Sequence, residues 1–132
     1  MSEPVVFISH FRIKEGRLEA VGQLNKEVTQ RLEAEKPRTL VFLAYMDRER
    51  TRISFLHVFA DQESMDVHFE GSDERGRAAY ELVVPEGWDV YGQPSDAAFE
   101  TLRQVAAAGG VPLTVQPTYV SGFLRPRGKA PT

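Results

Sequence analysis

Apolar and polar positions alternate over residues 5–13, and this pattern predicts a first β-strand. The odd positions form a core face, in which Ser9 is the one polar residue. The even positions are apolar at the beginning of the strand and polar at its end, at His10 and Arg12. One face of this strand is therefore expected in the core, and the other is half apolar and half polar.

Apolar residues then recur every three or four positions from Leu18 to Leu32, which is the spacing of an amphipathic helix. Gly16 separates this helix from the first strand. Pro37 ends the helix, because its ring removes a hydrogen-bond donor and disfavours helical geometry in the preceding residue.

Residues 39–46 and 52–60 are rich in Phe, Val, Leu and Ile and predict two further strands. The short charged segment 47–50 joins them, as in an antiparallel hairpin. Both faces of residues 40–46 are apolar, so this strand is expected to be covered on both sides. A chain of this size rarely covers both faces of a sheet alone, and the pattern therefore indicates a partner.

The second half of the chain predicts shorter elements. Asp61 and Ser95 have the residue type and the position of helix N-caps. The expected elements are a helix over residues 62–70, a helix over residues 77–84 closed by Pro85, a short extended piece over residues 88–91, a helix between Ser95 and Gly109, and a last strand over residues 118–124.

This order of elements predicts a ferredoxin-like α+β fold, in which an antiparallel sheet carries its helices on one face. We expect a single domain over residues 1–124, with an extra C-terminal helix and strand added to the core, and a flexible tail over residues 125–132. The other face of the sheet would remain apolar and open in a monomer. Two copies are therefore expected to pair as a homodimer.

Composition narrows the range of functions. The 132 residues include 16 Lys and Arg against 19 Asp and Glu, and the net charge of −3 argues against a nucleic-acid-binding protein. Because there are no cysteines, disulfides, thiolate metal sites and cysteine nucleophiles are excluded. The longest apolar stretch, residues 41–46, is too short for a bilayer, and the N-terminal residues lack the pattern of a signal peptide. These features predict a cytoplasmic protein with no membrane partner.

The common catalytic motifs are also missing. The sequence has no Walker loop, no G-x-G-x-x-G, no G-x-S-x-G and no H-E-x-x-H. None of the three histidines has a histidine neighbour three or four positions away, so the spacing predicts no compact metal site, and a metal site built across elements has no support in the sequence.

His57 and His68 are the candidate catalytic residues. His57 lies in the middle of a predicted strand, on the same face as Phe59, and His68 lies on the helix that follows. If that strand face packs on that helix, the two imidazoles converge in one apolar cavity, where one of them could accept a proton from a phenol or an enol. The alternative is that both are core histidines bonded to backbone or hydroxyl groups.

Aromatic residues are the candidates for binding a small hydrophobic or aromatic substrate. Trp88 could stack on a planar ligand, although a single Trp is more often a large packing residue. Tyr45 and Tyr119 could add hydroxyl groups to the same cavity as Phe59, or could lie at the edge of the core.

Residues 55–69 resemble the antibiotic-biosynthesis-monooxygenase-like group of dimeric α+β barrels. That group tends to have a strand that ends in an aromatic residue plus Asp or Ser, followed by a helix that carries a His. Phe59, Asp61 and His68 match this pattern. With the opening strand and first helix included, the resemblance covers roughly residues 5–84.

The resemblance implies a homodimer whose sheets form a barrel, with a cavity between helices and sheet in each subunit. Some members oxidise polycyclic phenols with O₂ and no cofactor, and others cleave haem. The haem-cleaving members use an Asn, a Trp and a His at positions that are held here by Ser9, His68 and Ala78, so haem cleavage is not expected.

The leading hypothesis is therefore a cofactor-independent monooxygenase that acts on an aromatic or quinol-type small molecule. His68 or His57 would deprotonate the substrate, and the resulting anion would pass an electron to O₂. One alternative is a non-catalytic dimeric barrel that binds a small molecule or regulates a partner, because one fold hosts many functions. Another is a structural dimerisation domain without a cavity.

Overall fold

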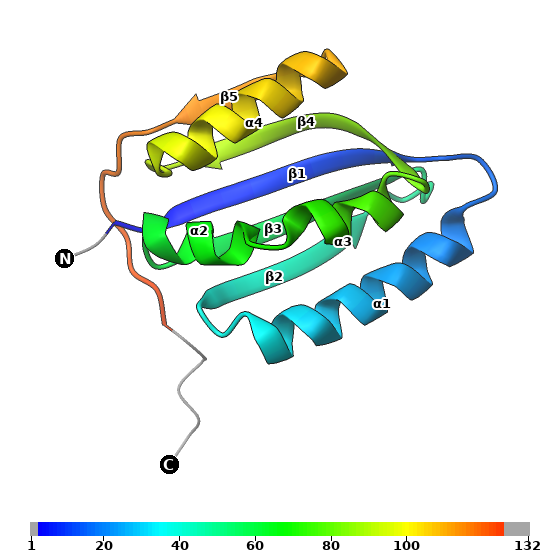
Figure 1. Cartoon of the computed structure of the whole chain (residues 1–132), viewed down its shortest axis with the longest axis horizontal. Helices are drawn as coiled ribbons and strands as arrows, with labels where there is room; N and C mark the ends of the chain where they lie inside the picture. Colours follow the sequence, from blue (N-terminus) through cyan, green and yellow to red (C-terminus); the bar gives the residue numbers. More distant parts are fainter. Residues whose placement is uncertain (1–2, 126–132) are drawn as a thin grey trace.

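The computed structural model describes residues 3–125 as one sheet with helices packed on it (Figure 1). The elements in chain order are β1 (Val5–Ile13), α1 (Leu18–Glu35), β2 (Thr39–Met46), β3 (Arg52–Phe59), α2 (Gln62–Phe69), α3 (Ser72–Ala79), β4 (Val83–Tyr91), α4 (Asp96–Gly109) and β5 (Leu113–Gln116).

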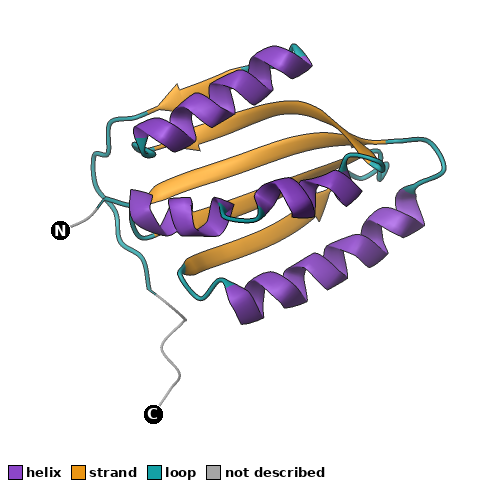
Figure 2. Ribbon diagram, in the orientation of Figure 1, coloured by secondary structure: helices purple, strands orange, loops and turns teal. Residues whose placement is uncertain are grey.

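The sheet has the strand order β2-β3-β1-β4-β5. The first four strands are antiparallel to their neighbours, and β5 runs parallel to β4. The four helices lie on the same face of the sheet (Figure 2). The predicted ferredoxin-like α+β class, with an additional C-terminal helix and strand, is therefore confirmed.

Two polar residues begin helices as predicted. The Asp61 carboxylate accepts a hydrogen bond from the backbone N–H of Ser64 at 2.8 Å, at the start of α2. Ser95 Oγ accepts one from the backbone N–H of Ala98 at 3.1 Å, at the start of α4. Each bond satisfies a donor that the first helical turn leaves free. Gly71, with φ of 79°, then separates α2 from α3.

The helix predicted over residues 77–84 is wrong. Helix α3 ends at Ala79, and residues from Val83 onward belong to β4. Pro85 lies inside this strand, opposite Phe11 and next to a register shift in β1, where the ladder is already irregular and a missing N–H is tolerated. Trp88 therefore belongs to the fourth core strand and not to an added segment.

The last strand is also placed differently from the prediction. Strand β5 is Leu113–Gln116, and residues 118–124 have no regular secondary structure. Helix α4 ends at Gly109, and residues 113–116 then pair with β4, so the pairing is complete before residue 118. Of the predicted flexible tail, residues 126–132 lie outside the described residues.

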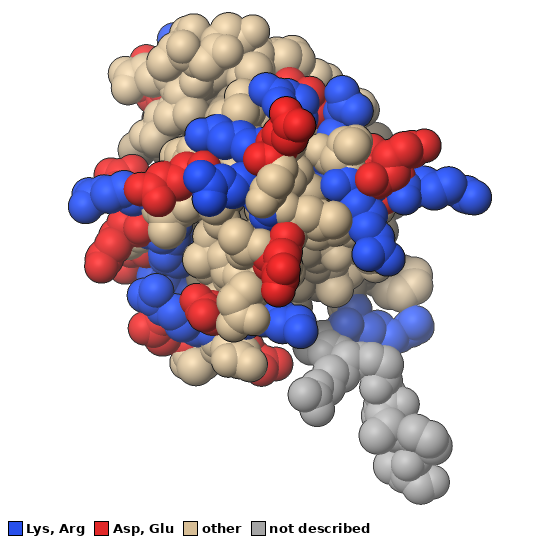
Figure 3. All heavy atoms as spheres, turned by 90° about the vertical axis from the view of Figure 1, so that its right-hand side faces the viewer, with Lys and Arg blue, Asp and Glu red and all other residues tan. Residues whose placement is uncertain are grey.

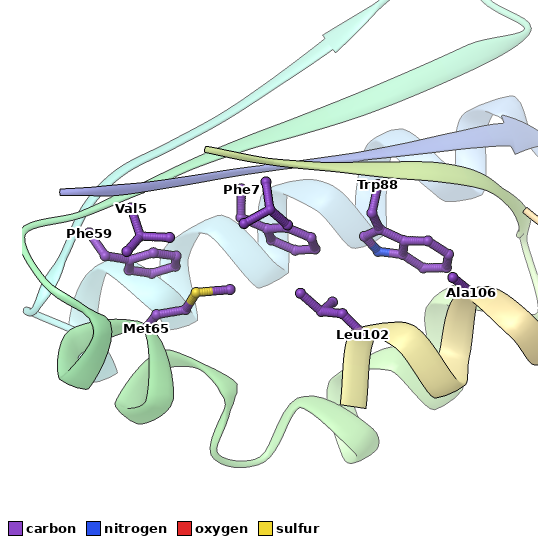
Figure 4. Packing of buried hydrophobic residues seen from close by; sticks show 8 residues of the cluster. Val5, Phe7, Phe59, Met65, Trp88, Leu102 and Ala106 are labelled. Carbon is purple, nitrogen blue, oxygen red and sulfur yellow. The ribbon is translucent and has the colours of Figure 1, made fainter. Parts of the chain in front are cut away.

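The main core lies between the sheet and helices α2 and α4 (Figure 4). Its buried residues are Val5, Phe7, Phe59, Met65, Trp88, Val90, Leu102 and Ala106. A smaller cluster contains Val21 of α1 together with Ile13, Ile53 and Val83. Helix α1 buries Val21 and Leu32, and α3 has no buried residue.

The face of the sheet that carries no helix is named here the open face. The register pairs Val6 with Val58 and Ile8 with Leu56, and places Leu43 beside Leu56, so one half of this face is apolar. In the same way His10 lies opposite Ser54, and Arg12 lies opposite Arg52, so the other half is polar. Leu43 is 45 % exposed, so a single copy of the chain does not cover β2 on both sides.

Candidate functional site

The structure brings the two candidate histidines together beneath the helices. His57 comes from β3 and His68 from α2, both are buried, and their ring centroids are 5.1 Å apart. They meet because α2 begins only two residues after β3 ends and packs back on the strand that precedes it.

Aromatic rings surround this pair. The ring of Phe59, which is fully buried, lies 5.2 Å from that of His68 and 6.1 Å from that of His57. Phe7 and Phe42 lie 5.1 and 5.2 Å from His57. Of the predicted site residues, His57, His68 and Phe59 therefore form one apolar cluster.

Each imidazole has one hydrogen-bond partner through Nδ1. The Nδ1–H of His57 donates to the backbone carbonyl of Phe7 at 3.0 Å. Because a carbonyl only accepts, the neutral ring of His57 carries its proton on Nδ1 and leaves a lone pair on Nε2. His68 Nδ1 lies 2.6 Å from Thr39 Oγ1, at the start of β2.

Both histidines are neutral at pH 7. Burial is the main cause in each case, and it lowers the pKa of His57 to about 4 and that of His68 to about 3. The positive charges of Arg75 and Lys36, together with His57, lower the pKa of His68 further. Both imidazoles are therefore available as proton acceptors at neutral pH, although as weak bases.

The two cations also fix the end of the helix that carries His68. Lys36 Nζ donates to the carbonyl of Val67 at 2.8 Å. Arg75 donates to the carbonyl of His68 at 2.6 Å and to that of Glu70 at 3.0 Å. The carbonyls of the last helical turn lack the regular partner four residues on. The end of α2 is therefore held by these two side chains and by the backbone N–H of Glu70, which donates to the carbonyl of Val67 at 3.3 Å.

A cavity of about 360 Å³ lies between α1 and β2. It is lined by Thr29, Leu32 and Glu33 of α1 and by Thr39, Leu40, Val41, Phe42 and Leu43 of β2. Two of these residues also contact the histidine pair: Thr39 bonds to His68, and Phe42 packs on His57. The cavity and the buried imidazoles thus share one wall, and a hydroxyl group lies in it.

The other predicted binding residues lie elsewhere. Trp88 is buried beneath α4, beside Leu102 and Ala106, where it is part of the core (Figure 4). Tyr45 is 61 % exposed and lies on the open face, opposite Ser54. Tyr119 lies in the irregular segment after β5, and its hydroxyl donates to the carbonyl of Gly122 at 3.0 Å. None of these three contributes to the cavity wall.

Two polar residues near α1 and β2 were not anticipated from the sequence. Thr39 gave no signal of its own, because its partner His68 is 29 residues away. Asn25 Oδ1 is buried without a hydrogen-bond partner, and it is the one such side-chain atom in the described part of the chain. It lies four positions after Val21 and seven before Leu32, on the buried stripe of α1, and that spacing was visible in the sequence.

Further features of the described residues are the distribution of surface charge, the possible metal ligands and the possible membrane-spanning helices. Basic and acidic side chains are intermingled over the end of the molecule that carries the β2–β3 turn (Figure 3). Across residues 3–125, no group of three His, Asp or Glu side chains is arranged to hold a metal ion. No helix within that range is both long and apolar enough to cross a bilayer.

Comparison with known proteins shows similarity of structure. No known family model matches the sequence, and no curated protein matches it. MupZ from Pseudomonas fluorescens is similar over 95 % of this chain and 97 % of its own, with a TM-score of 0.70 and 18 % identity. SnoaB, a cofactor-independent oxygenase from Streptomyces nogalater, is similar over 71 % of this chain and 96 % of its own, with a TM-score of 0.59 and 13 % identity.

A candidate antibiotic biosynthesis monooxygenase from Chloroflexus aurantiacus is similar over 67 % of this chain and 90 % of its own, with a TM-score of 0.55 and 14 % identity. Further candidate antibiotic biosynthesis monooxygenases are among the similar structures. At these identities the likeness is one of fold, and it agrees with the resemblance seen in residues 55–69. The chain therefore has the α+β fold of the antibiotic-biosynthesis-monooxygenase-like proteins.

Proposed function

We propose that the protein is a cofactor-independent monooxygenase for an aromatic or quinol-type small molecule, and that the substrate binds in the cavity between α1 and β2. The fold supports this proposal, because SnoaB is a cofactor-independent oxygenase of similar structure. The observation that carries it is the hydrogen bond between Thr39 and His68. It connects a buried neutral imidazole to the wall of a cavity large enough for a small ligand.

In this proposal the Thr39 hydroxyl is the positioning group and His68 is the base. The substrate hydroxyl gives its proton to Thr39 Oγ1 while Thr39 gives its own to His68 Nδ1. The resulting anion passes one electron to O₂, and the two radicals combine to a hydroperoxide. Loss of water then leaves a carbonyl, so a CH₂ group and one O₂ become a C=O group and one H₂O. The protein excludes water and orients the ring.

Oxygen uptake tests the proposal. Hydroquinones and anthrones should be consumed by the wild-type protein, and Thr39→Val should lower kcat by about 100-fold, the range of one general acid–base contribution. Because the pKa of His68 is about 3, no histidine titration should appear in the rate between pH 5 and 9. Thr29→Val is the matched control, since Thr29 lines the same cavity.

Two results would contradict this assignment. One is the absence of oxygen uptake above the spontaneous rate for every substrate tested. The other is an equal loss of rate in Thr29→Val and Thr39→Val, because of these two threonines it is Thr39 that bonds to the imidazole of His68.

A non-catalytic binding protein is the second candidate, and the low pKa values favour it. An imidazole that titrates near 3 or 4 is a weak base at pH 7, which suits a packed binding wall as well as a proton acceptor. A ligand that binds in the cavity without consumption of O₂ would support this candidate over the oxygenase.

We also propose that the protein forms a homodimer through the apolar half of the open face. Val6, Ile8, Leu43, Leu56 and Val58 form a continuous patch on three adjacent strands. In a dimer with two-fold symmetry this patch would pack against the same patch of the second copy, so apolar residues would meet apolar residues. A second copy would cover the side of β2 that one subunit leaves exposed.

A further inference from the structure

Three polar side chains form a hydrogen-bonded chain on the open face, on the opposite side of the sheet from His57 and His68. His10 of β1 lies between Ser54 of β3 and Asp89 of β4. Its Nδ1 lies 2.8 Å from Ser54 Oγ, and its Nε2 lies 2.8 Å from Asp89 Oδ2. This is the residue set of a nucleophile, a base and an orienting carboxylate.

The register of the sheet produces this arrangement. Ser54 is directly opposite His10 in the β1–β3 ladder, where side chains on one face lie closest. Asp89 pairs with Ile8, so it lies diagonally across from His10 on the other neighbouring strand. All three side chains are thus held by central strands of the sheet, which is a rigid support.

The direction of both hydrogen bonds follows from chemistry. The Asp89 carboxylate only accepts, so the neutral imidazole of His10 must carry its proton on Nε2. Nδ1 then has a lone pair, and the Ser54 hydroxyl must donate to it. The serine proton therefore points at a base whose opposite side is held by an anion, which is the functional order of a catalytic triad.

The hydrogen-bonded group of Ser54, His10 and Asp89 is accessible to solvent, and side chains that can donate hydrogen bonds lie beside it. The side chain of His10 is 39 % exposed and that of Asp89 is 30 % exposed. Tyr45 is opposite Ser54 on β2, and Arg12 is diagonal to Ser54, within the reach of long side chains across a ladder. Arg52 is paired with Glu86 at 2.9 Å, whereas Arg12 has no ion pair within residues 3–125.

We propose that Ser54, His10 and Asp89 are a second reactive site, which hydrolyses small carboxylic esters, and that Arg12 gives it a preference for esters with a nearby anionic group. Ser54 Oγ attacks the ester carbonyl carbon and its proton passes to His10 Nδ1. The tetrahedral intermediate collapses, and the departing alkoxide takes that proton. Water then attacks the acyl-serine and gives a proton to His10, and His10 passes this proton to the departing Ser54 oxygen, so the acid and the free serine are released.

This site is compatible with the proposed dimer because it occupies the polar half of the open face. The apolar half ends at the pair Ile8–Leu56. The next pair on the same face is His10–Ser54, which begins the polar half. Arg12, Arg52, Glu86 and Asp89 carry charge in the polar half, and removing these charges from water would be costly. We therefore place this half outside the dry part of the interface.

Labelling with an alkyl fluorophosphonate and hydrolysis of p-nitrophenyl acetate test the proposal on the intact protein. The label should be found on Ser54 by peptide mass spectrometry, and Ser54→Ala and His10→Ala should lower the hydrolysis rate by about 100-fold or more. Ser121→Ala, an exposed serine after β5, is the matched control and should react like the wild type. Arg12→Gln should raise KM for p-nitrophenyl hemisuccinate but not for the acetate.

Asp89→Asn separates a positioning role from a merely structural one. It should slow the labelling of Ser54, and NMR of the His10 ring should show that the Nε2–H form is no longer the dominant tautomer. The proposal is overturned if Ser54 is not labelled, if Ser54→Ala hydrolyses the ester at the wild-type rate, or if Asp89→Asn changes neither the labelling rate nor the tautomer. Oxygen uptake by Ser54→Ala should equal that of the wild type, so this result does not depend on the oxygenase assignment.

Discussion

Lowering the pH from 7 to 5 is expected to reduce the free energy of unfolding by about 4 kcal/mol, divided between His57 and His68. In the unfolded chain both imidazoles bind a proton with the ordinary pKa of 6.5, whereas in the fold burial lowers the pKa of His57 to about 4 and that of His68 to about 3. Below pH 6.5 the unfolded state therefore binds more protons than the folded state, and stability falls with the pH. Above that pH this contribution is fully present.

Urea unfolding at pH 7, 6 and 5, at one protein concentration, measures this effect. The double variant His57→Asn with His68→Asn should lose most of the pH dependence, and each single variant should lose about half of it. An equal stability at pH 7 and pH 5, or an unchanged slope in the double variant, would show that the pair is not buried and neutral.

Leu56→Glu is expected to convert the proposed homodimer to a monomer, with a dissociation constant raised about 100-fold or more. Leu56 lies in the centre of the apolar half of the open face, between Ile8 and Leu43 on its two neighbouring strands. In a dimer with two-fold symmetry the substitution places an unpaired carboxylate in the interface twice, where it loses its contact with water.

Sedimentation velocity at micromolar concentration measures the oligomeric state. The wild type should sediment as a dimer and Leu56→Glu as a folded monomer. Val105→Glu is the control, because Val105 is 37 % exposed on α4, on the helical side of the sheet. The dimer proposal is abandoned if the wild type sediments as a monomer, or if Val105→Glu dissociates it as readily as Leu56→Glu.

Features that depend on nearby residues were predictable from the sequence. Asp61 and Ser95 cap their helices through bonds to residues three positions away, so residue type and position were sufficient. The contact between His57 and His68 could also be predicted from the sequence, because β3 and α2 are consecutive and the two residues are 11 positions apart. Residues 77–84 were misassigned because Ala78 and Ala79 favour a helix locally, while the pairing of β4 with β1 decides the structure from Val83 onward.

Features that depend on long-range register were not predictable. Ser54 and Asp89 are 44 and 79 residues from His10, and only the strand order places all three together. Thr39 contacts His68 near the start of β2, where the pairing with β3 has a register shift. No local sequence pattern predicts this shift. The register of β2 also places Tyr45 away from the cavity, because its side chain lies on the face of the sheet opposite to those of Phe42 and Ala44.

The central claim is that a ligand in the cavity between α1 and β2 reaches His68 through Thr39. NMR of the histidine ring nitrogens during titration with a hydroquinone or an anthrone, without O₂, tests it most directly. We predict that the resonances of His68 shift with saturation while those of His10 stay unchanged, and that Thr39→Val removes the shift. Saturable binding that leaves His68 unaffected, or a His68 shift that persists in Thr39→Val, would contradict the claim.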